Sequence, residues 1–300
     1  MNDFIQAVSE EFKEIKFIKG ARNGKYPFSH SLLIDDFLID TGISSRLLRK
    51  LKRIYPINKV ILSHWHEDHI HGNRLLRNAK FYIHPEDKFL IENVDKFYEY
   101  YGVSGSYEDD AMGWLMQGLR YENTRIEKTI EDNEIIKIGK NYDLKVLHTP
   151  GHTAGHCSFY ELNSKIGFLA DIDLTKFVFY GGVDSNLIDF ERSIKKLKEF
   201  EMNIAITGHR GVIRGSKEVK TELDKYQSII DKADERILSY LSETNPKSVV
   251  DLKNKNLVYK YYSLFKDYEL IAEMIMIQKH FDKFIAKGFV EQIGNGYILS

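Results

Sequence analysis

Apolar positions along this chain fall into short runs separated by amphipathic stretches. The runs at 31–34, 37–39 and 60–62 suit buried strands, because they are too short for helices and are bounded by polar turn residues. By contrast, the segment 190–200 repeats its apolar residues at helical spacing. Strands that alternate with helices predict an α/β layer architecture.

One of these apolar runs leads directly into a histidine-rich loop. Residues 64–71 read His-Trp-His-Glu-Asp-His-Ile-His. Histidine is the commonest side-chain metal ligand, and carboxylates join it on divalent ions. His64 and His66 point the same way in an extended segment, whereas the adjacent Asp68 and His69 point to different sides. One ion cannot easily use all four, so two neighbouring ions are expected rather than a solvated loop that happens to be rich in histidine.

Three later strand ends deliver further metal-ligand residue types. His152 follows the tight turn that Pro150 and Gly151 enforce, Asp171 ends an apolar run, and His209 ends another one. Loops that follow strands and converge on one side of a sheet make a natural active-site edge. We therefore expect these side chains to join the histidine loop in one site.

Composition excludes several other classes of protein. The chain has 300 residues, 43% of them hydrophobic, and a formal net charge of −1, so no global field favours nucleic acid or an anionic membrane. Cys157 is the single cysteine, which rules out an intramolecular disulfide and a CxxC zinc ribbon. The acidic segment 1–19 lacks the apolar core of a signal peptide, and no 18-residue apolar run is present. A cytoplasmic protein without a membrane span is expected.

Two segments depart from the strand–helix alternation. Residues 86–123 are rich in Tyr, Phe, Leu and Met and predict two or three helices, as an insertion in a catalytic domain over 1–215. This insertion either packs on itself or walls the site. Residues 216–300 predict three helices and a hairpin, which resembles a winged helix. From 217 onward this tail has 13 basic and 13 acidic residues, so a structural or homodimer role is favoured over nucleic-acid binding.

Taken together, the motifs resemble those of the metallo-β-lactamase superfamily. The resemblance covers roughly residues 12 to 215 and implies a four-layer αββα sandwich with a dinuclear metal site at one edge. The matching motifs are Asp40-Thr41-Gly42, His64-x-His66-x-Asp68-His69, Thr149-Pro150-Gly151-His152-Thr153, Ala170-Asp171 and Thr207-Gly208-His209.

The resemblance also implies a ligand set. One ion would be held by His64, His66 and His152, and the other by Asp68, His69 and His209, with Asp171 bridging both. Zinc is the expected metal, with iron or manganese as alternatives. Asp68 would additionally orient the nucleophile or take up its proton.

Three positions depart from the family pattern, and none of them is a proposed metal ligand. His71 stands where the family usually has Gly, and Ala170 precedes the bridging aspartate where Gly is usual. Leu174 stands where acyl-homoserine lactonases have a Tyr, so that subfamily is disfavoured.

Several other candidates are expected to have supporting or structural roles. His148 and His156 flank His152 and suit an outer shell that orients ligands. Cys157 is expected to be a small buried hydrophobe, and His280 a structural residue of the tail.

The implied chemistry is attack by a metal-bridging hydroxide. The first hypothesis is a metal-dependent hydrolase of a small-molecule ester, thioester or lactone. The alternative is a phosphodiesterase or endoribonuclease of the same fold acting on RNA. A non-hydrolytic di-iron redox protein is disfavoured, because that class normally has Glu where His66 stands. A closed aromatic pocket would favour the small ester, and a basic groove would favour RNA.

Overall fold

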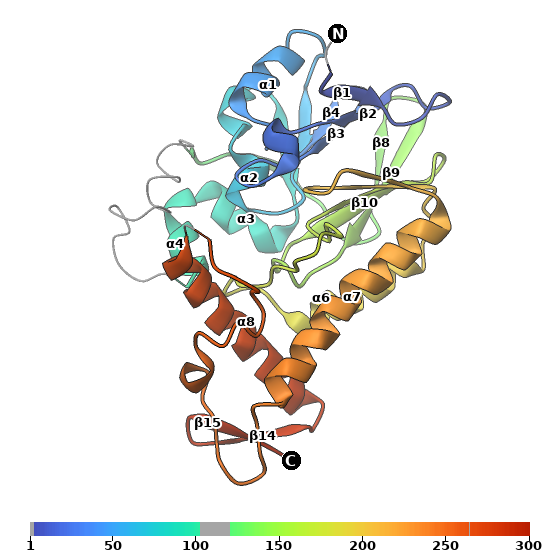
Figure 1. Cartoon of the computed structure of the whole chain (residues 1–300). Helices are drawn as coiled ribbons and strands as arrows, with labels where there is room; N and C mark the ends of the chain where they lie inside the picture. The colour runs from blue at the N-terminus through green and yellow to red at the C-terminus, as the bar shows by residue number, and fades with distance from the viewer. Residues whose placement is uncertain (1–2, 103–120, 264) are drawn as a thin grey trace.

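The computed structural model describes residues 3–102, 121–263 and 265–300. Two β-sheets face one another in the upper part of the molecule, and helices cover their outer faces (Figure 1). The helices α7 and α8 extend away from the sheets toward a small C-terminal hairpin (Figure 1). No helix within these described residues has both the length and the apolarity needed to cross a membrane.

The first sheet holds seven strands in their order along the chain. Strands β1 to β4 pair antiparallel, and β4 to β7 pair parallel. Strand β2 begins at Ile15, and the amide of Ile15 bonds back to the carbonyl of Phe12 in the preceding turn. The strands are β1 (Ile5–Ala7), β2 (Ile15–Ile18), β3 (Ser31–Ile34), β4 (Phe37–Ile39), β5 (Lys59–Ile61), β6 (Lys80–Ile83) and β7 (Ile126–Thr129).

The second sheet holds six strands in the order β13-β12-β11-β10-β9-β8. Only the β11–β12 pair within it is parallel. Its strands are β8 (Ile135–Ile138), β9 (Tyr142–His148), β10 (Cys157–Glu161), β11 (Ile166–Ala170), β12 (Ile204–Thr207) and β13 (Val212–Arg214).

Helices in the described segments cover both sheets and build the tail. The α-helices are α1 (Ser45–Leu51), α2 (Glu67–Ile70), α3 (Pro85–Glu92), α4 (Phe97–Tyr100), α6 (Leu187–Lys198), α7 (Ser216–Leu238) and α8 (Lys266–Ala286). Single 3-10 turns are η1 (Ala21–Gly24), η2 (Asn73–Leu75), η3 (Val94–Lys96) and η4 (Val250–Leu252). Helices α3 and α4 belong to the predicted helical insertion, whose segment 112–116 lies outside the described residues.

Buried side chains form separate layers that hold this arrangement together. Between the sheets, Phe17 and Ile34 of the first sheet pack with Phe159 and Phe168 of the second. A second cluster lies under α1 to α4, and a third lies under α6 and α7. Burial of this apolar surface is the dominant favourable term in folding. The four-layer αββα class predicted from the sequence is therefore confirmed.

The tail has its own small core as well as a share in the main one. Tyr226 of α7 is buried with the second sheet, whereas Ile237, further along α7, is buried with Phe281 of α8 and Tyr297. Strands β14 (Val290–Ile293) and β15 (Gly296–Leu299) form the predicted hairpin. The middle helix of the tail is only the turn η4, and both the winged-helix resemblance and the domain boundary at 215 stay predictions.

Candidate metal centre

Strand ends from both sheets meet at one edge of the sandwich. His64 and His66 follow β5 of the first sheet, and α2 begins one residue later. From the second sheet, His152 follows β9, Asp171 follows β11 and His209 follows β12. The topology therefore brings together all of the side chains that the sequence singled out, although they lie up to 145 positions apart in the chain.

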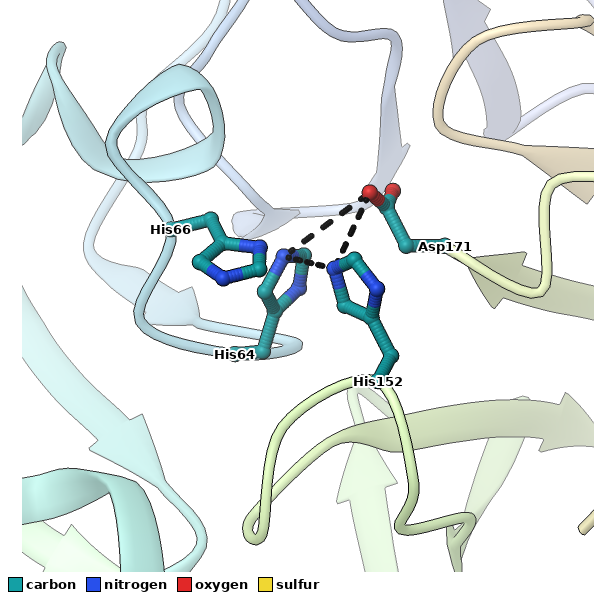
Figure 2. A group of neighbouring side chains, drawn as sticks. All are labelled: His64, His66, His152 and Asp171. Atoms are coloured by element: carbon teal, nitrogen blue, oxygen red, sulfur yellow. Dashed lines mark hydrogen bonds and ion pairs between the residues drawn. The ribbon is translucent and has the colours of Figure 1, made fainter. Parts of the chain in front are cut away.

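Figure 2 shows the first of two groups of side chains, His64, His66, His152 and Asp171. One nitrogen or carboxylate oxygen from each lies within 4.8 Å of the others. The Nε2 atoms of His64 and His152 are 3.3 Å apart, and Asp171 Oδ2 is 3.3 Å from His152 Nε2. These atoms point into a common space from three different loops.

The second group consists of Asp68, His69 and His209, and Asp171 connects it to the first. Asp68 Oδ2 is 3.3 Å from His209 Nε2. Asp171 Oδ1 is 2.9 Å from His69 Nε2, and its Oδ2 is 3.4 Å from His209 Nε2. Asp171 thus faces both groups, one oxygen toward His69 and the other toward His152 and His209.

Hydrogen bonds at the opposite ring nitrogens indicate what these groups are built to hold. His152 Nδ1 donates to the carbonyl of Phe179 at 2.9 Å, and His209 Nδ1 donates to the carbonyl of Gly24 at 2.7 Å. When these rings are neutral, as metal ligands must be, each has a lone pair on Nε2 that faces other lone pairs and carboxylates. His66 Nε2 is buried and has no hydrogen-bond partner among the described residues. Lone pairs and anions gathered at this distance fit divalent cations between them.

The pKa of His209 shows the same excess of negative charge. Burial by itself lowers this pKa, but the facing carboxylates of Asp171 and Asp68 overcome that effect and raise it to about 10. A site that favours a proton on an imidazole so strongly also favours a metal cation in its place.

A buried aspartate orients the ligands from behind. Asp40 Oδ2 accepts hydrogen bonds from His69 Nδ1 and from the hydroxyl of Ser63, both at 2.7 Å. The hydroxyl of Ser63 in turn lies 2.9 Å from His64 Nδ1. One carboxylate therefore fixes the rings of two candidate ligands, which is the usual task of an outer shell. The sequence contained a signal for it, because Asp40 begins one of the matching motifs.

Asp87 of α3 is a site residue that the sequence analysis missed. Its carboxylate accepts hydrogen bonds from the amide of Trp65 at 3.1 Å, the hydroxyl of Thr153 at 2.8 Å and the amide of Gly155 at 2.6 Å. Trp65 lies between two histidines of the first group, and Thr153 follows the third. Asp87 thus joins the two ligand-bearing loops.

The backbone at the site is tightly constrained. Ala170 has φ 48°, a left-handed conformation that favours glycine, which explains why glycine is usual before this aspartate. Gly208 has no room for a side chain, since a Cβ there would lie 2.7 Å from Asp171 Oδ1 and 2.9 Å from His69 Cε1.

The other candidates lie outside the two groups. His156 supports the site, because its Nε2 accepts the amide of Asp171 at 3.1 Å, whereas His148 bonds the carbonyl of Ala154. Cys157 is buried as expected. His71 is buried and does not line the cavity described next.

A cavity of about 590 Å³ opens onto both groups. Its described walls come from the first 101 residues, from the loops after β9, β11 and β12, from Tyr226 of α7 and from the C-terminal segment 259–269. Glu67 lies in its wall and accepts hydrogen bonds from the hydroxyls of Tyr26 and Tyr101. Eight of the described residues that line it are aromatic: Tyr26, Tyr101, Phe177, Phe179, Tyr226, Tyr259, Phe265 and Tyr268.

Comparison with known proteins identifies a family. The family model described as metallo-beta-lactamase superfamily matches residues 28–209, the part of the chain that carries both groups. The hydroxyacylglutathione hydrolase GloC of Haemophilus influenzae is 27% identical over 198 residues, covering 60% of this chain and 84% of that protein. The acyl-coenzyme A thioesterase MBLAC2 of Bos taurus is 24% identical over 194 residues, covering 58% and 68%.

A solved structure extends the similarity of fold to the tail. The beta-lactamase domain protein from Burkholderia ambifaria superposes with a TM-score of 0.73 at 16% identity. The match covers 99% of this chain and 94% of that one. At 16% identity this similarity concerns the fold alone, and it extends over the tail, residues 216–300.

Proposed function

The chain belongs to the metallo-beta-lactamase superfamily and is a metal-dependent hydrolase, and we propose that it cleaves a small-molecule carboxylic ester, thioester or lactone. His64, His66 and His152 would hold one divalent ion, and Asp68, His69 and His209 the other, in line with the two observed groups. Asp171 would bridge the two ions, since its oxygens face both groups.

Zinc is the metal we propose, because imidazole and carboxylate are ligands that suit it. When bound, a pair of divalent ions supplies Lewis acidity and lowers the pKa of a water held between them. The protein's own part begins with Asp68, which lines the cavity. Its carboxylate is placed to orient the attacking water and to accept the proton that this water loses.

The aromatic lining of the cavity is the observation that supports a small uncharged substrate. Eight of its described lining residues are aromatic, and its volume lies within the usual range for small-molecule sites. Lys25 is the only lysine or arginine among the described lining residues. A groove for RNA needs cationic side chains that follow the phosphate backbone, so the alternative of RNA cleavage is disfavoured.

Two relatives also support hydrolysis of a carbonyl substrate. Their names describe a hydroxyacylglutathione hydrolase and an acyl-coenzyme A thioesterase, and both names denote action on thioesters. The chemistry at the carbonyl of a thioester is the chemistry that an ester or a lactone requires.

The test is a substrate panel measured on zinc-loaded protein. We expect hydrolysis of esters, thioesters or lactones, and its loss in Asp68→Ala and His152→Ala, with circular dichroism unchanged and metal content reduced. Asp95→Ala serves as control, because this aspartate is exposed and lies outside both groups. Cleavage of phosphodiesters alone, or full activity in either ligand variant, would contradict the proposal.

A further inference from the structure

The aromatic wall of the cavity forms a continuous path away from the metal groups. The ring of Tyr101 stacks on His66 with centroids 5.6 Å apart and planes at 22°. Tyr268 of α8 meets Tyr101 edge-on, with centroids 5.7 Å apart and planes at 88°. Tyr101 thus contacts both His66 and Tyr268, and all three residues line the cavity.

A second aromatic pair belongs to the same cavity. Phe177 and Tyr259 pack with ring centroids 4.6 Å apart, and both line the cavity. Phe179 lies nearer the metal groups, with its ring 5.9 Å from that of His152. Aromatic rings supply large apolar contact area and favour edge or face contact with another ring.

Three of the five tyrosines among the described lining residues donate their hydroxyl groups to the protein. Tyr26 and Tyr101 both donate to the carboxylate of Glu67, and Tyr226 donates to the carbonyl of Asp171. What these residues offer a ligand is thus mainly ring surface rather than hydrogen-bonding groups. The wall is therefore suited to an apolar group.

Acidic side chains outnumber basic ones among the described lining residues, which disfavours an anionic ligand. Outside the two metal groups, the described lining residues include the carboxylates Glu67, Asp173 and Glu269, against the single exposed amine of Lys25. An acyl group with a carboxylate or phosphate would lie among like charges, which costs binding energy.

We propose that the acyl group of the substrate is uncharged and aromatic, or similarly bulky and apolar, and that the C-terminal segment selects it through the ring of Tyr268. This inference rests on the proposed ester or thioester hydrolysis and specifies its substrate. Tyr268 is a specificity residue here, because it contacts the acyl group and not the reacting bond.

The experiment compares three N-acetylcysteamine thioesters that share one leaving group. The acyl groups are acetyl, phenylacetyl and glutaryl, which are small, aromatic and anionic respectively. For the zinc-loaded protein we expect kcat/KM to be roughly tenfold or more higher for phenylacetyl than for acetyl. Glutaryl should be the poorest substrate.

Variants of Tyr268 assign the preference to the ring. Tyr268→Ala should reduce the phenylacetyl value roughly tenfold more than the acetyl value, since a small acyl group makes less contact with this ring. Tyr268→Phe should keep the preference, because it retains the ring. Tyr261→Ala is the matched control, as this tyrosine of the same segment is 79% exposed. All variants are checked by thermal unfolding.

A binding measurement provides a readout that does not depend on turnover. Calorimetry should show phenylacetamide, which has the acyl group but no cleavable ester, binding to the wild type more tightly than to Tyr268→Ala. Equal rates for phenylacetyl and acetyl, a preference for glutaryl, or an equal loss on both neutral substrates in Tyr268→Ala would overturn the inference. Failure to hydrolyse any thioester, ester or lactone would instead contradict the proposed function.

Discussion

The carboxylate of Asp40 accepts a hydrogen bond from Nδ1 of His69 at 2.7 Å, with both side chains fully buried. This contact fixes the proton of His69 on Nδ1 and leaves Nε2 facing Asp171. In Asp40→Asn the side-chain amide could turn its NH₂ group toward Nδ1 of His69. Because Nδ1 already has a proton, the hydrogen bond that orients the ring would be lost. We expect metal affinity to fall about 10- to 100-fold.

Metal titration of the purified variant against a chromophoric chelator measures this effect. The control is Asp36→Asn, which changes an aspartate at the turn before the same strand β4, remote from the ligands. An unchanged affinity in Asp40→Asn would show that the orientation of His69 does not depend on this carboxylate.

Asp87 should matter for both stability and metal binding. Removing its carboxylate in Asp87→Ala leaves the amides of Trp65 and Gly155 and the hydroxyl of Thr153 without their acceptor. We expect the free energy of unfolding to fall by at least about 2 kcal/mol and metal affinity to fall with it.

Glu86→Ala is the matched control, because this neighbour on α3 is exposed. Denaturant unfolding and metal titration are compared for the two variants. Equal stability and equal affinity would mean that the two loops hold their positions without Asp87.

The sequence predicts the candidate metal ligands far better than it predicts the residues that support them. The meeting of the candidate ligands could be predicted because most of them follow an apolar strand, as His209 follows β12, and their role as ligands stays a prediction. The partners behind them were not, since contacts such as Trp65 Nε1 to Asp184 Oδ2 join residues 119 positions apart. The meeting of Tyr101 with Tyr268 likewise depends on how the tail packs, and no local pattern encodes that.

The fold followed the same logic. The hairpin of β3 and β4 is local, because its two apolar runs are separated only by a short polar turn in the sequence. Such a pattern predicts the strands directly. His280 was expected to be structural, and it is buried with bonds to Tyr180 and Asp234. Nothing in the sequence indicated these partners, because they lie 100 and 46 positions away.

Lys283 of α8 is a fully buried cation at the junction of the tail with the main domain. Its ammonium group pairs with Glu191 of α6 at 2.8 Å and with Asp234 of α7. Lys283→Met would leave both carboxylates without this partner, so we expect a loss of about 3–5 kcal/mol in the free energy of unfolding.

Lys287→Met is the control for Lys283. Lys287 pairs with the same Glu191 at 3.3 Å, but its side chain is 45% exposed, so its loss should cost about 1 kcal/mol or less. Equal effects of the two substitutions would contradict the role of burial.

The pH dependence of stability should report on Glu222. Hydrogen bonds from Arg210 and Lys225 lower the pKa of Glu222 from its usual 4.5 to about 2. The ionised form is therefore favoured by folding, and its stabilisation is present above pH 4.5 and lost as the pH falls toward 2.

Glu222→Gln should thus have a lower Tm than the wild type at pH 7, and the difference should shrink between pH 4.5 and 2. Glu218→Gln, an exposed change on the same helix, should show no such pattern. A difference in Tm that stays constant down to pH 2 would show that the charge of Glu222 is not involved.

Anomalous diffraction from crystals of the zinc-loaded protein would locate the metal ions themselves. We predict two peaks, one among His64, His66 and His152 and one among Asp68, His69 and His209, with Asp171 between them. A single peak, or peaks away from these side chains, would contradict the proposed dinuclear site.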